Sequence, residues 1–583
     1  MLVLYGIRRM IMDDRIRTKL EYIYGQKSGL ATSRRLNKTI EKWRKTLPEI
    51  PGFPDGGVPA DEGDAVMISY GDNIQSPEMV PLAALKDFAD QHLNGVISGI
   101  HILPFSPYSS DDGFSVMDYR EVNPDWGSWT DISAIGSRFR LMADLVLNHC
   151  SAKGTWFKQF LAGVPKYQNF FITVEPGTDL TAVFRPRALP LLHEFEVNGE
   201  KKQVWTTFSD DQVDLNFANP DVFLEFIDIL LDYVGKGVRI IRLDAIGFLW
   251  KEIGTSCMHH PKTHEMVKLF RLVLAETAPG VILITETNVP HKENISYFGN
   301  GTDEAHMVYQ FTLPPLTMDA YIRGDASKLT SWAQTLPEPN PDFTFFNFLA
   351  SHDGVGVLPA RGYLSDEEIE ALITAVKGRG GLISYKATPA GEIPYELNIS
   401  YRDAIAEKTL PDSLRAAKFL SSQAVMLSMA GMPGIYIHSL LGSGNWKEGV
   451  GLTGANRTIN REKLSLAQLN TELDDPSSLR SMIFNGYSLL LKARSSHRAF
   501  HPAAAQKILD IGPSIFGLIR TSSDGRGVLC LQSVSSENQR IELPSEFSGY
   551  QSIHDIYGDV DIPVKEGCVE MTPWQVLWLE NDN

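Results

Sequence analysis

The sequence predicts an α/β protein built around a (β/α)8 TIM barrel, and two observations lead to this fold class. Eight short apolar runs are separated by amphipathic stretches: 66–70, 99–105, 140–148, 238–247, 281–286, 306–311, 343–350 and 434–438. The runs are nearly continuous in Val, Ile and Leu, which is typical of parallel strands buried on both faces. Eight such strands alternating with helical stretches match the architecture of a barrel.

One of the intervening stretches carries clear helix boundaries. In PDVFLEFIDILLDYVGKG, Asn219 is suited to the N-cap and Pro220 to the first helical position. Gly235 and Gly237 lie where the apolar periodicity stops, and glycine is typical of a helix C-terminus. The pattern predicts a helix from Pro220 to about Gly235, ahead of the fourth strand.

The spacing of the strands predicts further domains. Two gaps, at about 150–237 and 354–433, are too long for simple loops and predict inserted subdomains after strands three and seven. Residues 1–64 predict a helical N-terminal extension with a Pro/Gly-rich linker. The catalytic barrel with its insertions is expected over 65–504, and the short strand-like pieces in 505–583 predict a C-terminal antiparallel β domain.

Composition narrows the function classes. The 583 residues include 54 Lys and Arg against 71 Asp and Glu, a formal charge of −17. This balance argues against a partner that is a nucleic acid or an anionic membrane, because phosphate neutralisation needs clustered cations. The four cysteines are scattered and predict buried free thiols. Two arginines and two aspartates interrupt the N-terminal apolar stretch, so we expect a cytoplasmic protein rather than a secreted one.

One uncharged segment, 419–446, raises the alternative of a membrane span. It contains the helix breaker Met432-Pro433-Gly434 and several polar side chains. These features favour a buried helix followed by a buried strand over a helix in lipid.

Polar residues follow the apolar runs, at the strand ends where barrel enzymes hold their active sites. They are Asp111 and Phe114 after strand two, His149 at strand three, Arg242 and Asp244 at strand four, Glu286 at strand five, and His352 and Asp353 at strand seven. A single acid in such a place is often a helix cap or an ion-pair partner. Three acids converging on one mouth favour glycosyl transfer, which needs two carboxyl groups flanking a glycosidic bond.

Arg242 lies two residues before Asp244, on the same strand face, where it would keep that carboxylate ionised; a purely structural ion pair is the alternative. Neither a metal nor a cofactor is predicted. His259, His260 and His264 lie in a polar loop without a matching carboxylate pattern. The Gly-rich stretch 441–454 lacks the ending of a phosphate-binding loop and is interpreted as an active-site loop after strand eight.

Four segments resemble a known family. DLVLNH (144–149), RLDAIG (242–247), ITE (284–286) and ASHDG (350–354) are similar, in order, to the four signature regions of the α-amylase family, glycoside hydrolase family 13. The resemblance implies that Asp244 is the nucleophile, Glu286 the general acid/base and Asp353 the transition-state stabiliser. It places His149, Arg242 and His352 at the glucose-binding subsite.

Longer segments, among them GIHILPFSPYSSDDGFSVMDY, FRPRALPLL and NRTINR, resemble the sucrose-phosphorylase branch of that family. By this resemblance Asp111 binds the far hydroxyls of the glucose and Phe114 is an aromatic wall. Arg457 contacts the same glucose, although NRTIN replaces the GRDIN that is common in the branch. Arg187 helps to bind phosphate and Tyr395 lies near the acceptor.

The branch resemblance implies a retaining α-glucoside phosphorylase whose substrates are an α-glucoside, inorganic phosphate and α-D-glucose 1-phosphate. SSDDGFSV, WTTFSDDQVDLN and ITETNVPHK are most similar to members with glycerate as acceptor, implying reversible phosphorolysis of 2-O-α-D-glucosylglycerate to α-D-glucose 1-phosphate and D-glycerate. Retention predicts about 5 to 5.5 Å between the two catalytic carboxyl groups. Sucrose, sucrose 6-phosphate or glucosylglycerol phosphorolysis, an α-glucosidase or transglucosidase, and a non-catalytic carbohydrate-binding protein are the alternatives.

Overall fold

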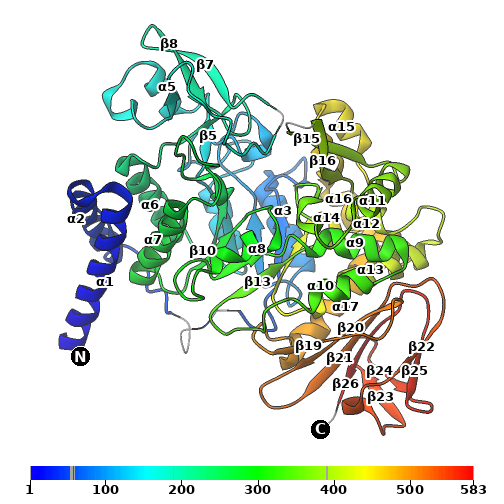
Figure 1. Cartoon of the computed structure of the whole chain (residues 1–583). Helices are drawn as coiled ribbons and strands as arrows, with labels where there is room; N and C mark the ends of the chain where they lie inside the picture. Colours follow the sequence, from blue (N-terminus) through cyan, green and yellow to red (C-terminus); the bar gives the residue numbers. More distant parts are fainter. Residues whose placement is uncertain (1, 53–56, 58–59, 188, 389–390, 582–583) are drawn as a thin grey trace.

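The computed structural model describes residues 2–52, 57, 60–187, 189–388 and 391–581 (Figure 1). Its centre is a closed barrel of eight parallel strands in the order β1-β17-β13-β12-β11-β10-β4-β3. The strands are β1 (Val66–Ser69), β3 (Gly99–Ile102), β4 (Arg140–Val146), β10 (Val238–Asp244), β11 (Ile282–Thr285), β12 (Met307–Tyr309), β13 (Thr344–Asn347) and β17 (Met432–Tyr436). Each comes from one of the eight predicted runs, so the predicted barrel is confirmed.

Several predicted runs extend beyond the observed strands, and at two of them the difference moves site residues. β13 stops at Asn347, so His352 and Asp353 lie in the loop beyond it rather than at the strand end. β4 stops at Val146, and His149 instead opens β5 (His149–Ser151), which pairs with β9 (Gln212–Asp214). In both places the chain stays apolar after leaving the barrel ladder, because it remains buried against the inserted segments, so hydrophobicity alone overestimates the strand.

Helices cover the outside of the barrel. They are α3 (Pro81–His92), α4 (Trp129–Gly136), α6 (Pro220–Gly235), α7 (Pro261–Thr277), α8 (His291–Asn294), α9 (Leu313–Arg323), α10 (Ser327–Ala333), α13 (Asp412–Ser428), α14 (Ile437–Leu440), α16 (Leu466–Asp474) and α17 (Leu479–Ser496). The short helix α15 (Lys447–Thr453), in the segment 441–454 predicted as an active-site loop, lies near the barrel mouth instead (Figure 1). The predicted caps of α6 are confirmed: the Asn219 side chain accepts from the Asp221 N–H at 3.0 Å, and Gly237 has a φ of 105°.

The uncharged segment 419–446 forms the end of α13, then β17 and α14, as predicted. Within the described ranges, none of the helices has the length and apolar character needed to cross a membrane.

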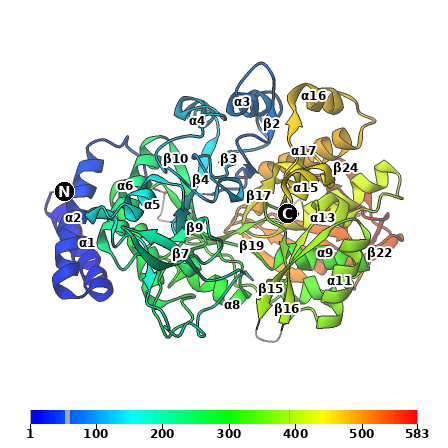
Figure 2. The ribbon, with the colours of Figure 1, turned by 90° about the horizontal axis from the view of Figure 1, so that it is seen from above.

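Two long excursions leave the barrel, one after β4 and one after β13. The first contains α5 (Thr155–Leu161), β6 (Thr173–Val174), β7 (Leu192–Val197) and β8 (Glu200–Trp205), besides β5 and β9. The second contains β14 (Val355–Gly356), α11 (Asp366–Gly378), β15 (Leu382–Thr388), β16 (Gly391–Asn398) and α12 (Tyr401–Ile405). The β7–β8 and β15–β16 hairpins rise on the same side of the barrel, as Figures 1 and 2 show, and frame its mouth.

The N-terminal helices α1 (Leu2–Tyr24) and α2 (Gln26–Arg44) pack on α6 and α7 (Figure 1). Lys19 forms an ion pair with Glu265 at 2.8 Å, and the Trp43 indole donates to Asp228 at 2.7 Å. The extension is thus docked on the barrel. Much of the predicted linker after it, 53–56 and 58–59, lies outside the described residues.

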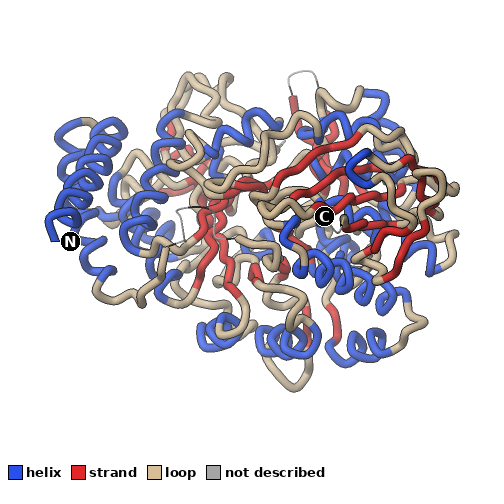
Figure 3. Tube along the Cα trace, turned by 90° about the horizontal axis from the view of Figure 1, so that it is seen from below, coloured by secondary structure: helices blue, strands red, loops and turns tan. Residues whose placement is uncertain are grey.

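The C-terminal region forms antiparallel sheets beside the barrel (Figure 3), which confirms this part of the predicted fold class. Their strands are β19 (Ala505–Leu509), β20 (Ile515–Thr521), β21 (Gly527–Ser533), β22 (Gln539–Glu542), β23 (Ser552–Asp555), β24 (Val560–Pro563), β25 (Cys568–Met571) and β26 (Val576–Glu580). Two short strands elsewhere, β2 (Ile74–Gln75) and β18 (Leu464–Ser465), pair with each other. The Arg520 guanidinium donates to the Ser428 carbonyl at 3.0 Å and joins this sheet to α13.

Candidate active site

A cavity opens at the mouth of the barrel. Every site residue predicted from the sequence lines it: Asp111, Phe114, His149, Arg187, Arg242, Asp244, Glu286, His352, Asp353, Tyr395 and Arg457. These side chains come from the segments that end or follow β3, β10, β11, β13 and β17, and from both excursions. The fold therefore brings the whole predicted set together in one place.

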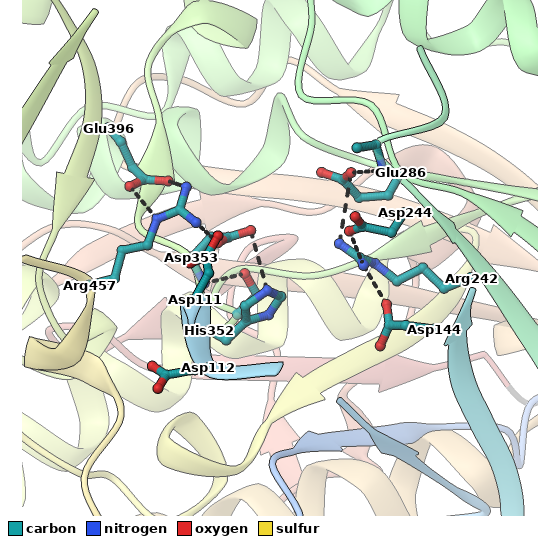
Figure 4. A network of polar contacts seen from close by, with 12 residues as sticks. Asp111, Asp112, Asp144, Arg242, Asp244, Glu286, His352, Asp353, Glu396 and Arg457 are labelled. Atoms are coloured by element: carbon teal, nitrogen blue, oxygen red, sulfur yellow. Dashed lines mark hydrogen bonds and ion pairs between the residues drawn. The ribbon is translucent and has the colours of Figure 1, made fainter. Parts of the chain in front are cut away.

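Asp244, the last residue of β10, is held by its own strand. Arg242, two residues earlier, donates from one guanidinium nitrogen to Asp244 at 2.7 Å and also to Asp144 of the neighbouring β4 (Figure 4). The His101 ring pairs with the other Asp144 oxygen at 2.7 Å. Because Arg242 is only 3% exposed, this contact orients the Asp244 carboxylate and supplies a fixed positive charge beside it.

Glu286 follows β11 and faces the same guanidinium. Its Oε2 atom lies 3.8 Å from Arg242 and accepts a hydrogen bond from the Ala245 N–H at 3.1 Å. Ala245 has a φ of 48°, a left-handed conformation that turns the chain sharply after Asp244. That turn aims the amide at Glu286 and leaves Oε1 free of this contact to carry a proton.

Burial disfavours the charged forms of Asp244 and Glu286. Burial raises the pKa of Asp244, and repulsion by Glu286 adds to the effect although Arg242 opposes it. Burial also raises the pKa of Glu286. The raised pKa values favour a pair that keeps one proton. We place that proton on Glu286, because the 2.7 Å hydrogen bond from Arg242 favours the charged form of Asp244 over that of its more distant neighbour.

Asp353 lies across the cavity and is held by Arg457, which comes from the segment after β17. Arg457 pairs with Asp353 at 2.7 Å and with both carboxylate oxygens of Glu396, on β16, at 2.9 and 3.0 Å (Figure 4). Burial opposes the charge on Asp353, but the Arg457 and Arg461 guanidinium groups outweigh it and lower the pKa of Asp353 below the usual range. Asp353 is thus a permanent anion in the cavity.

Aromatic and imidazole rings form one wall of the cavity. Phe114 stacks on His352 with 4.8 Å between ring centroids and 8° between planes. The His149 ring donates from Nε2 to the Phe114 carbonyl at 2.9 Å. Burial lowers the pKa of His149 to about 4 and that of His352 to about 3, so both rings are neutral at pH 7. The wall thus presents flat apolar surface with neutral polar edges.

The first excursion places Arg187 over the cavity. Arg187 pairs with Asp111 at 3.2 Å and lies over the Phe208 ring at 5.4 Å. The same Asp111 oxygen accepts from the Gln212 amide at 3.1 Å. Tyr395, on β16, lines the cavity from the second excursion. The two residues predicted for phosphate and acceptor binding therefore reach one cavity from different insertions.

Sequence reasoning missed three residues that shape the site. Asp144 accepts a hydrogen bond from Arg242, Gln212 donates one to Asp111, and Glu396 accepts one from Arg457. Asp144 lies inside the DLVLNH segment, five residues before His149, so its position was available as a signal. Gln212 and Glu396 belong to insertion strands whose partners are 101 and 61 residues away, and no local pattern marks them.

Glu396→Gln tests whether the Arg457 bridge positions Asp353. The amide cannot keep the bidentate ion pair, so Arg457 loses its fixed orientation, and we expect kcat/KM to fall by about 10- to 100-fold. Steady-state kinetics measure the change, and Glu392→Gln, an exposed acid on the same strand, is the matched control. An unchanged kcat/KM in the Glu396 variant contradicts a positioning role.

Comparison with known proteins agrees with this site. The catalytic-domain model of the alpha-amylase family matches residues 94–359. A glucosylglycerate phosphorylase of Spirochaeta thermophila is 56% identical over 97% of this chain and 98% of its own length. One of Escherichia coli is 45% identical over 98% and 100%. The crystal structure of a sucrose 6F-phosphate phosphorylase from Thermoanaerobacter thermosaccharolyticum, 24% identical, covers 82% of this chain and 94% of its own with a TM-score of 0.71.

The solved structure, at 24% identity, supports the fold alone. The family model and the two phosphorylase relatives indicate common descent. Identity of this level over nearly the full length of both chains confirms the resemblance to the sucrose-phosphorylase branch that the motifs indicated. The chain therefore belongs to the α-amylase family, in the group that contains the glucosylglycerate phosphorylases.

Proposed function

We propose that this protein is a retaining α-glucoside phosphorylase that reversibly converts 2-O-α-D-glucosylglycerate and phosphate into α-D-glucose 1-phosphate and D-glycerate. The observation that carries the proposal is the buried Asp244–Glu286 pair, in which both carboxyl groups face the Arg242 guanidinium. The nearly full-length relatives named glucosylglycerate phosphorylase support the choice of acceptor.

In the first step Asp244 attacks the anomeric carbon of the glucosyl group. The Arg242 hydrogen bond keeps the attacking carboxylate ionised, and Glu286 gives its proton to the departing glycerate oxygen. A β-glucosyl ester on Asp244 results. Since the Ala245 N–H holds Glu286 Oε2, the proton leaves from a carboxyl group of fixed orientation.

In the second step phosphate attacks the same carbon from the side that glycerate left. Glu286, now a carboxylate, takes the proton of the attacking phosphate, and the ester bond to Asp244 breaks. Two inversions give α-D-glucose 1-phosphate with retained configuration. Arg187, at the cavity rim, supplies a cation for the entering anion, which otherwise faces three acids.

The remaining lining residues bind the glucosyl group in this proposal. Asp353, held ionised by Arg457, stabilises the oxocarbenium-like transition state through its charge. Asp111 and His149 bind sugar hydroxyls, and the stacked Phe114 and His352 rings cover a face of the sugar. A cytoplasmic location, which the sequence predicts, stays a prediction.

The shared proton sets the pH dependence of phosphorolysis. Because burial raises the pKa of Glu286 above its usual range, Glu286 holds its proton below this raised pKa and loses the proton as the pH rises through it. We expect kcat/KM for glucosylglycerate to fall by about tenfold per pH unit on the alkaline side of this value. Initial rates across neutral and alkaline pH measure the limb, and Glu286→Gln should remove it. A profile that stays flat far into alkaline pH contradicts the assigned proton.

Acceptor choice is tested by supplying α-D-glucose 1-phosphate with D-glycerate, glycerol, fructose or fructose 6-phosphate, one at a time, and measuring phosphate release. Preferential release with D-glycerate supports the proposal. Preference for another acceptor keeps the mechanism and replaces the substrate with that of a sucrose-, sucrose 6-phosphate- or glucosylglycerol-type enzyme. Release that no acceptor accelerates points to a hydrolase or a transglucosidase.

A further inference from the structure

Lys386, on β15, is buried without a counter-charge. The residue is only 8% exposed, and among the described residues its ammonium group has neither an ion pair nor a hydrogen bond; it lies over the Phe184 ring at 5.0 Å. Lys418, which is 5% exposed, illustrates how a mostly buried lysine is usually stabilised: it forms an ion pair with Glu407 at 3.0 Å. The stem of Lys386 is covered by protein while its charge has no partner, so Lys386 is a residue whose partner is expected to be a ligand.

The position of Lys386 relates it to the cavity. Phe184, the ring beneath its ammonium group, lines the cavity together with Arg187, three residues further along the same loop. Tyr395, on the paired strand β16, lines the cavity from the other side of the hairpin. Lys386 therefore lies beside the end of the cavity that these insertion residues form, away from the barrel strands that carry Asp244.

The cations that line the cavity each have a carboxylate partner, and the proposed function assigns one of them, Arg187, to the phosphate. Arg187 pairs with Asp111, Arg242 pairs with Asp144 and Asp244, and Arg457 pairs with Asp353 and Glu396. An acceptor that brings its own carboxylate into this surrounding of acids needs a further positive charge. Lys386 carries a positive charge that has no ion-pair partner among the described residues. The flexible four-carbon stem of a lysine allows its ammonium group to move to a ligand.

We propose that Lys386 is a specificity-determining residue that binds the carboxylate of an organic-acid acceptor. The inference rests on the proposed function and adds to it the group that separates an acidic acceptor from a neutral one. The ammonium group and the carboxylate form a charge-assisted hydrogen bond in a site from which most water is excluded. A neutral polyol of the same size leaves the lysine unpaired, and discrimination follows from that unsatisfied charge.

The test uses Lys386→Met, which keeps the length of the stem and removes the charge. With α-D-glucose 1-phosphate as donor, we expect KM for D-glycerate to rise by about 10- to 100-fold, while kcat/KM with glycerol changes by less than about threefold. KM for phosphate in the reverse direction should stay within about threefold, because the predicted phosphate ligand is Arg187. Lys386→Arg should recover part of the lost affinity for glycerate.

Arg361→Gln is the matched control. Arg361 is a neighbouring cation that raises the local positive charge, but it is exposed and pairs with Asp366 at 3.1 Å. Its removal should change KM for D-glycerate by less than about twofold. Hydrolysis of α-D-glucose 1-phosphate without acceptor reports whether each variant is folded and active; if Lys386→Met fails this check, Lys386→Gln takes its place.

Two results would overturn the inference. One is an unchanged KM for D-glycerate in the charge-removing variant; the other is an equal rise in KM for phosphate, which would make Lys386 a general anion attractor. Failure of the proposed function looks different, because the unaltered protein would then show no preference for D-glycerate over glycerol in the first place.

Discussion

Asp244→Ala will lower kcat for glucosylglycerate phosphorolysis by at least about 10⁴-fold, because removal of a nucleophile eliminates the covalent route. The loss should be confined to chemistry. Arg242 retains its contacts with Asp144 and Glu286, so the buried guanidinium keeps counter-charges and the barrel should stay folded. Stopped assays of phosphate consumption measure kcat, and thermal unfolding monitored by circular dichroism is the control.

Azide gives this first prediction a stereochemical readout. The small anion fits the space that the Asp244 carboxylate leaves, and it attacks the anomeric carbon from the β face. With α-D-glucose 1-phosphate as donor, the Ala variant should form β-D-glucosyl azide. Turnover close to that of the unaltered protein, or the α anomer of the azide, would mean that another group is the nucleophile.

Glu286→Gln will produce the second large effect, which depends on the leaving group. The amide keeps an oxygen for the Ala245 N–H but has no acidic proton, so we expect kcat/KM for glucosylglycerate to fall by about 10²- to 10⁴-fold. Fluoride leaves without protonation; α-D-glucosyl fluoride should therefore still glucosylate Asp244 rapidly. Rapid-quench measurement of the covalent intermediate separates this step from its slow breakdown.

Azide then distinguishes Glu286 from Asp244. Azide attacks the accumulated β-glucosyl ester without needing a base, so the Gln variant should yield α-D-glucosyl azide, the opposite anomer from that of the Asp244 variant. Asp353→Asn is a useful comparison, because it should slow donors with good and poor leaving groups alike. Equal losses with fluoride and glycerate leaving groups in the Glu286 variant would contradict its assignment as the proton donor.

Most of the barrel and the local part of the site could be predicted from the sequence. Seven of the eight strands lie within the predicted apolar runs and β17 overlaps the eighth, since burial on both faces demands continuous apolar residues and leaves a recognisable pattern. The contact between Arg242 and Asp244 could be predicted because alternate residues of a strand share a face. The 2.7 Å hydrogen bond between the two side chains confirms this prediction.

The tertiary structure decided the rest, because those contacts join segments that no sequence period relates. Three contacts join residues far apart in the sequence. Arg457 and Glu396 are separated by 61 residues, Arg187 and Asp111 by 76 residues, and Lys19 and Glu265 by 246 residues. Lys386 is one of many lysines in the sequence; only burial without a partner distinguishes it. Sequence by itself determined the fold and the acids of the reaction, through local periodicity and motifs. Long-range packing of the two insertions determined which charges remain unpaired for a ligand.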